Sequence, residues 1–130
     1  MAWLDGSGKV QPLPANWNGA CLGERPPHIV FNPELRRQVA EVVGVQTNAL
    51  ARARRIFRWV SANIPWCAED EYCIIPSFTT KGFTARQGDC GVQNTVFISM
   101  CRIAGMPARW QSSAASLSLA MELARSPGSR

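Results

Sequence analysis

The residue of this 130-residue chain that is best placed to do chemistry is Cys90, which follows Gly88 and Asp89 at the start of the clearest helical pattern. Asp89 is a good helix N-cap, because its carboxylate can accept hydrogen bonds from the first free backbone N–H groups. A thiol in the first turn lies at the positive end of the helix dipole, and this favours the thiolate. The pattern therefore predicts a nucleophilic cysteine at the start of a helix.

The helix that carries Cys90 is predicted to end near Gly105, a residue type suited to the left-handed position after a helix, and Pro107 prevents its continuation. Its apolar residues form two stripes on adjoining faces. One stripe consists of Val92, Val96, Met100 and Ile103, and the other of Phe97, Cys101 and Ala104. A helix that is apolar over so much of its circumference is usually packed on several sides. We therefore expect a central, buried helix.

Two more helices are indicated before this one. Asn32 is a capping residue for the first, Pro33 suits the first helical position, and Gly44 closes the segment. The second begins at Asn48 and ends before Pro65, because the residue that precedes a proline avoids the helical region. Each of these helices carries apolar residues at helical spacing, which form its inner face.

Arginine covers much of the second helix, at positions 52, 54, 55 and 58, and arginine supplies most of the net charge of +5. A nucleic-acid patch is one interpretation of such a run. No interleaved aromatic residues or groove-reading motif supports it, so a solvated face with long stems over apolar neighbours is favoured. We expect no nucleic-acid partner.

The remaining segments suggest three parts of the chain. Residues 1–27 show no sustained periodicity and form either an N-terminal arm or the tail of an upstream domain. Residues 28–112 form the main domain, in which residues 78–87 predict a short helix interrupted by Gly82 and residues 108–112 the beginning of a strand. Residues 113–130, composed mostly of Ser, Ala, Leu, Arg, Gly and Pro, form an atypical tail.

The cysteines and the single histidine, His28, argue against a metal site or another cofactor. Five cysteines without regular spacing do not predict a disulfide framework, and no C-x-x-C pair is present. Cys101 lies on a buried stripe and is interpreted as a core residue. Cys67 and Cys73 are either free or paired with each other. We expect neither a metal nor a cofactor.

No apolar run is long enough to cross a bilayer, and the N-terminus lacks the charged and apolar regions of a signal peptide. The sequence therefore predicts no membrane association and, by default, a cytoplasmic location.

Four runs together resemble the core of the transglutaminase-like superfamily, and more narrowly the bacterial transglutaminase-like domains of the papain-like thiol enzymes. They are RIFRWV at 55–60, NIPW at 63–66, GDCG at 88–91 and CRIAGMPAR at 101–109. The ordered pair of the last two runs is the specific part of the resemblance, which covers residues 28–112.

The resemblance implies an α+β fold in which the cysteine helix packs against an antiparallel sheet. It also implies a Cys-His-Asp triad with Cys90 as nucleophile, which forms a thioester with a carboxamide or peptide carbonyl of a protein or peptide substrate. The Cys90 backbone N–H would contribute to an oxyanion hole. Gln87 and Trp66 are candidates for polar support and a pocket wall, although structural packing is the favoured alternative for both.

The chain departs from the family pattern after Ser112. The pattern requires a histidine and then an aspartate on strands that follow the cysteine, but residues 91–130 contain neither. His28 precedes Cys90, opposite to the family order, and is interpreted as an edge residue rather than the base. We therefore expect a truncated or frameshifted member, mostly α because the sheet is largely missing, that is inactive alone and self-associates through an exposed core. The alternative is a non-catalytic binding or structural domain derived from this fold.

Overall fold

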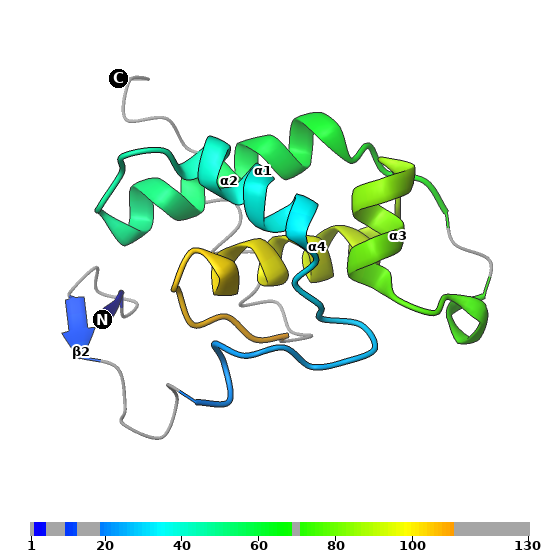
Figure 1. Cartoon of the computed structure of the whole chain (residues 1–130), viewed down its shortest axis with the longest axis horizontal. Coiled ribbons are helices and arrows are strands. Elements are labelled where there is room, and N and C mark those ends of the chain that lie inside the picture. The colour runs from blue at the N-terminus through cyan, green and yellow to red at the C-terminus, as the bar shows by residue number, and fades with distance from the viewer. Residues whose placement is uncertain (1, 5–9, 13–18, 69–70, 111–130) are drawn as a thin grey trace.

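The computed structural model describes residues 2–4, 10–12, 19–68 and 71–110 (Figure 1). In chain order its elements are β1 (Ala2–Leu4), β2 (Val10–Pro12), α1 (Pro33–Val43), α2 (Ala49–Asn63), η2 (Tyr72–Ile74, a short 3-10 helix), α3 (Phe78–Ala85) and α4 (Cys90–Ile103). The described part is thus mostly helical, as expected. The tail at 113–130 lies outside the described residues.

A short hairpin precedes the helices. β1 pairs antiparallel with β2, and Trp3 lies opposite Gln11 in the register. The sequence pattern does not predict this hairpin, because strands of three residues are too short to show the alternation by which a strand is recognised.

The helices begin where the capping residues predict. Asn32 accepts a hydrogen bond from the Leu35 N–H at 2.7 Å at the start of α1, and Asn48 accepts one from the Ala51 N–H at 3.0 Å at the start of α2. Each side chain satisfies one of the backbone donors that the first turn of a helix leaves unpaired. Local sequence therefore determines both starts.

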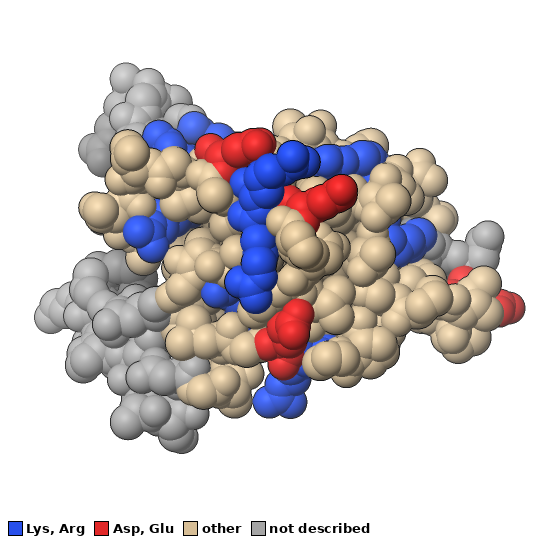
Figure 2. Space-filling model, viewed as in Figure 1, with Lys and Arg blue, Asp and Glu red and all other residues tan. Residues whose placement is uncertain are grey.

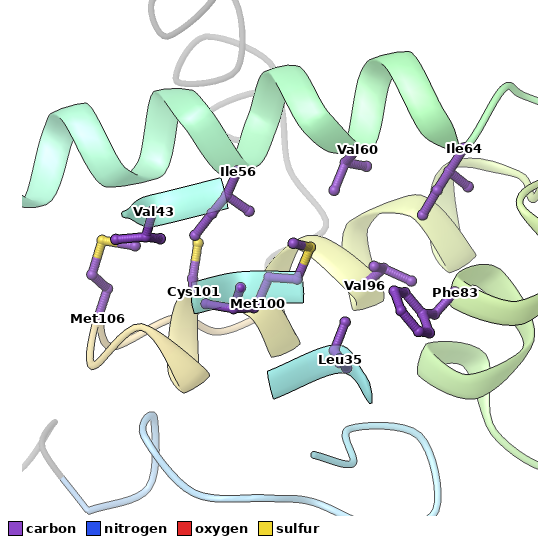
Figure 3. Close-up of a cluster of buried hydrophobic side chains, with 11 residues drawn as sticks. Leu35, Val43, Ile56, Val60, Ile64, Phe83, Val96, Met100, Cys101 and Met106 are labelled. Atoms are coloured by element: carbon purple, nitrogen blue, oxygen red, sulfur yellow. The ribbon is translucent and has the colours of Figure 1, made fainter. Parts of the chain in front are cut away.

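Helix α4 lies at the centre of the helical part, where α1, α2 and α3 all pack against it. Val92, Val96 and Met100 on its first stripe are fully buried, as predicted. In Figure 3, Ile56, Val60 and Ile64 extend from α2 toward the side chains of α4. The core they share also contains Leu35, Val39 and Val43 of α1, Phe83 of α3, and Cys101 and Met106.

Helix α3 continues through Gly82, so the predicted interruption at this residue is wrong. A Cβ atom at Gly82 would lie 2.6 Å from Val92 Cγ1 and 2.8 Å from Val96 Cγ2. The absence of a side chain therefore lets α3 approach the buried face of α4 closely. The cost of a glycine within a helix is offset by this packing.

The segment after α4 packs back on the domain without forming a strand. Gly105 has φ 78°, the left-handed conformation that was predicted for it, and the Met106 N–H bonds to the Cys101 carbonyl at 2.9 Å. Residues 106–110 contain no strand, so that expectation is wrong for the part that is described; residues 111 and 112 lie outside it. The Ala108 N–H instead donates to the Cys21 carbonyl at 3.0 Å.

Two arginines of α2 form hydrogen bonds to the C-terminal ends of neighbouring helices. The Arg52 guanidinium donates to the Ala104 carbonyl at the end of α4 at 3.1 Å, and Arg55 donates to the Val43 carbonyl at the end of α1 at 2.9 Å. Helix C-termini leave carbonyl groups unpaired, and cationic donors suit them. On the face shown in Figure 2, acidic side chains lie beside the band of basic ones. The arginines of α2 thus include structural contacts as well as solvated positions.

Candidate active site

Cys90 is the first residue of α4, and its side chain is exposed. Asp89 caps the helix: it has an extended backbone, and its Oδ1 accepts the Val92 N–H at 3.0 Å. The thiol therefore lies at the amino end of a buried helix and is open to solvent. Cys101, at the other end of α4, differs in that burial raises the pKa of its thiol to about 12. Of these two cysteines, Cys90 is the one that is accessible from solvent.

The turn that leads into Cys90 is held by the segment that follows α2. Trp66 and Gly88 form a parallel bridge, in which the Gly88 N–H donates to the Pro65 carbonyl at 3.2 Å and the Cys67 N–H donates to the Gly88 carbonyl at 3.1 Å. A Cβ atom at Gly88 would lie 2.4 Å from Val92 Cγ1, so only glycine fits there. This bridge fixes the direction in which the chain enters α4.

Helix α4 is also joined to the end of α2 by a side chain of its own first turn. The Gln93 amide donates to the Ile64 carbonyl at 2.7 Å. Ile64 is the C-cap of α2 and is fully buried, so this bond pairs a carbonyl that the helix itself leaves free. Sequence reasoning missed Gln93, and no local pattern marks its contact with Ile64.

Tyr72, on η2, packs over the first turn of α4. Its hydroxyl donates to Asp89 Oδ2, so the Asp89 carboxylate serves the helix cap and Tyr72 together. A Cβ atom at Gly91 would lie 2.4 Å from this hydroxyl and 3.0 Å from the ring carbon that bears it. Gly91 thus lets the tyrosine approach the backbone of the turn. Sequence reasoning missed Tyr72, and no local pattern marks it.

The contact with Asp89 changes the titration of the phenol. Its hydrogen bond to Asp89, partial burial, and the negative charges of Asp89 and of the Cys90 thiolate together raise the pKa of Tyr72 to about 12, while the Gly91 N–H acts in the opposite direction. Tyr72 therefore remains a neutral hydrogen-bond donor over the whole range in which a thiol ionises.

A row of rings supports Tyr72 from α3. The Tyr72 ring lies 5.1 Å from the Phe78 ring, and the His28 ring stacks on Phe78 at 4.2 Å. The His28 carbonyl also accepts the Thr79 N–H at 3.2 Å. His28 thus reaches the first turn of α4 through two other rings and acts as a packing partner.

The other predicted site residues lie on either side of this turn. Trp66 is 65% exposed, with its backbone in the bridge to Gly88, and Gln87 is exposed in the residue before that bridge. Their roles in a pocket or an oxyanion hole stay predictions. The described residues form no disulfide between Cys67 and Cys73, and they contain no group of metal-ligating side chains.

Comparison with known proteins identifies the family. A family model described as the transglutaminase-like superfamily matches residues 36–121. The chain belongs to the transglutaminase-like superfamily. Searches of curated proteins and of solved structures found no match to it.

The match to the transglutaminase-like superfamily spans α1, α2, α3 and α4, and so it includes the whole of the turn around Cys90. It extends beyond Ser112 to residue 121, into the part that the structure does not describe. The truncation or frameshift after Ser112 stays a prediction. In the described residues, no helix is both long and apolar enough to span a membrane.

Proposed function

We propose that this domain is a thiol enzyme unit in which Cys90 attacks the carbonyl carbon of a carboxamide or peptide. The observation that carries the proposal is the exposed thiol at the first position of a buried, capped helix in a chain of this superfamily. The dipole and the unpaired first-turn N–H groups of such a helix stabilise the thiolate. The substrate is a protein or a peptide, and the papain-like α+β architecture belongs to the same proposal.

The reaction has two steps. The Cys90 sulfur forms a bond to the carbonyl carbon, the amine departs after taking a proton from water, and a thioester remains. Water or an amine then attacks the thioester, and the sulfur departs as thiolate. The backbone N–H of Cys90 belongs to the first-turn donors that the helix does not use itself, which suits it to the oxyanion. Trp66 and Gln87 flank the same turn as candidates for the pocket wall and for polar support.

This chain on its own has Cys90 without a conventional base. His28 is its single histidine and packs on Phe78, and residues 91–130 contain neither histidine nor aspartate. Loss of the base and of its orienting acid from a triad costs several orders of magnitude in turnover. We therefore propose that Cys90 forms a thioester readily only with activated acyl groups, and that the chain resolves this thioester very slowly.

An activated ester tests whether Cys90 is the nucleophile and whether the thioester is resolved slowly. With p-nitrophenyl acetate, the Cys90 thiolate should take the acetyl group and release nitrophenolate in a single stoichiometric burst. Mass spectrometry should place the acetyl group on Cys90, hydroxylamine should remove it, and Cys90→Ala should abolish the burst. Acetylation of the exposed Cys73 to the same extent as Cys90 would refute the nucleophile assignment and favour a non-catalytic binding domain.

A further inference from the structure

We propose that Tyr72 is a positioning residue for Cys90, which acts by holding the Asp89 carboxylate on the helix cap and by neutralising part of its charge. This inference rests on the proposed function, because it concerns the reactivity of the same thiol. It concerns a residue that lies far from Cys90 in the sequence and on a different element.

The first step of the argument is the position of a negative charge next to the nucleophile. Asp89 directly precedes Cys90, and its Oδ1 accepts a hydrogen bond from the Val92 N–H. A carboxylate close to a thiol disfavours the thiolate, because like charges repel. The cap that starts α4 therefore opposes the ionisation that the helix dipole favours.

The second step is that Tyr72 reduces the effect of the Asp89 charge on the Cys90 thiol. Its hydroxyl donates to Oδ2, the carboxylate oxygen that the cap does not use. A hydrogen bond to an ionised acceptor is about twice as strong as one between neutral groups, and it withdraws charge from the acceptor. Both oxygens of Asp89 thus have donors, and less of the charge acts on Cys90.

The third step is that the tyrosine is held in place from several sides. Phe78 packs against its ring, and Gly91 offers no side chain that would push the hydroxyl away. Because the hydroxyl remains protonated while a thiol titrates, it donates to Asp89 throughout that range. Tyr72 is thus a fixed donor.

Few other charged or titratable groups surround this turn in the described part of the chain. Apart from Asp89, the segments next to it contribute Cys67 beside Gly88, Glu71, Tyr72 and Cys73 at η2, and Lys81 and Arg86 on or after α3. The Arg86 guanidinium lies over the rings of Trp59 and Phe83, at 4.8 and 4.7 Å from their centroids. Tyr72 donates directly to the Asp89 carboxylate.

The test is the rate of Cys90 alkylation by iodoacetamide as a function of pH, with N-acetylcysteine in the same tube as reference thiol and the site read by mass spectrometry. Tyr72→Phe keeps the ring on Gly91 and removes only the donor. We expect its midpoint to rise by about half a unit, equivalent to a roughly threefold slower reaction near neutral pH. At high pH, where every thiol is ionised, the variant and the wild type should react at the same rate.

Asp89→Asn separates a charge effect from a structural one. Asparagine is also a good N-cap, so α4 keeps its start while the charge is lost. In this background Tyr72→Phe should leave the midpoint unchanged, because no charge remains to be neutralised. An equal fall in rate at every pH, or the same half-unit rise with and without Asp89, would overturn the proposal.

The two proposals fail in distinguishable ways. If wild-type Cys90 follows the reference thiol at every pH, the proposed function is refuted. If wild-type Cys90 ionises below the reference thiol and Tyr72→Phe leaves it unchanged, the role of Tyr72 alone is refuted.

Discussion

Replacing Gly82 by alanine has two opposing effects on stability, a gain in helix propensity and a steric clash with α4, and the structure allows their sizes to be compared. In a helix interior, alanine is more favourable than glycine by about 1 kcal/mol. The added Cβ atom, however, would lie 2.6 Å from Val92 Cγ1 and 2.8 Å from Val96 Cγ2, both more than half an ångström inside ordinary contact. Both valines are fully buried, so moving them away would disturb neighbouring core side chains. Overpacking of a buried contact costs about 1 to 3 kcal/mol.

The steric cost should therefore exceed the gain in helix propensity. We expect Gly82→Ala to lower the free energy of unfolding by about 1 kcal/mol net. Urea denaturation followed by circular dichroism measures this change. With a slope of roughly 1 to 3 kcal/mol per molar urea, the midpoint should fall by about 0.3 to 1 M.

Two companion variants make this result specific. Thr84→Ala changes an exposed position of the same helix and should change stability by less than about 0.5 kcal/mol. Adding Val92→Ala to Gly82→Ala removes the methyl group that the new Cβ atom meets, so the double variant should be more stable than the sum of the single effects predicts. If Gly82→Ala is instead stabilised by the full propensity difference, the close approach of α3 to α4 is refuted.

Three further predictions follow from other contacts. Arg52→Ala should lower stability by about 1 kcal/mol in urea denaturation because it unpairs the carbonyl at the end of α4, whereas Arg58→Ala, at an exposed position, should have almost no effect. Met100→Ala should cost about 2 to 5 kcal/mol, and Val45→Ala, which is 96% exposed, less than about 0.5. Tyr72 is the only tyrosine, so phenolate absorbance reports its pKa, which should lie near 12. Because this folded-state pKa is raised above the ordinary 10, the contribution of Tyr72 to stability is complete below pH 10 and is lost as pH rises toward 12; Tyr72→Phe should lack this loss.

Helix positions could be predicted from the sequence because short-range chemistry determines them. Asn32, Asn48 and Asp89 each cap a helix through their own side chain, and Gly105 takes the left-handed conformation that a C-terminal residue requires. Each of these features depends on residues within one turn of the chain. The location of Cys90 at the start of α4 is predictable for the same reason.

The interruption predicted at Gly82 was wrong because helix propensity was considered without the partner helix. Propensity treats glycine as a defect, whereas tertiary packing makes it the residue that lets two helices meet. The strand expected at 108–112 fails in its described part for a similar reason. The Ala108 N–H finds its partner in Cys21, far away in the sequence, and this isolated bond does not continue into a ladder. Such pairings have no local signal.

The surroundings of Cys90 were the least predictable part of the candidate site. The turn is held by Trp66 from the segment after α2, through its bridge to Gly88, by Gln93 from α4 and by Tyr72 from η2, and these contacts join segments separated along the chain. Family resemblance identified the nucleophile position and the motifs on either side of it. It did not indicate that a tyrosine shares the carboxylate of the helix cap.

The contacts around Cys90 fall into two groups, one that determines the geometry of the turn and one that determines the electrostatics of the thiol. A Cβ atom added at Gly82 or at Gly88 would clash with the fully buried side chain of Val92. Substitution at either glycine should therefore change the stability of the fold and the position of the turn together. Tyr72 is 46% exposed and contacts the turn from outside the core, so loss of its hydroxyl should change the ionisation of Cys90 and leave the core packed. In this chain the geometry of the nucleophile and its electrostatics therefore depend on different residues. Substitutions at Gly88 and at Tyr72 can change the two properties separately.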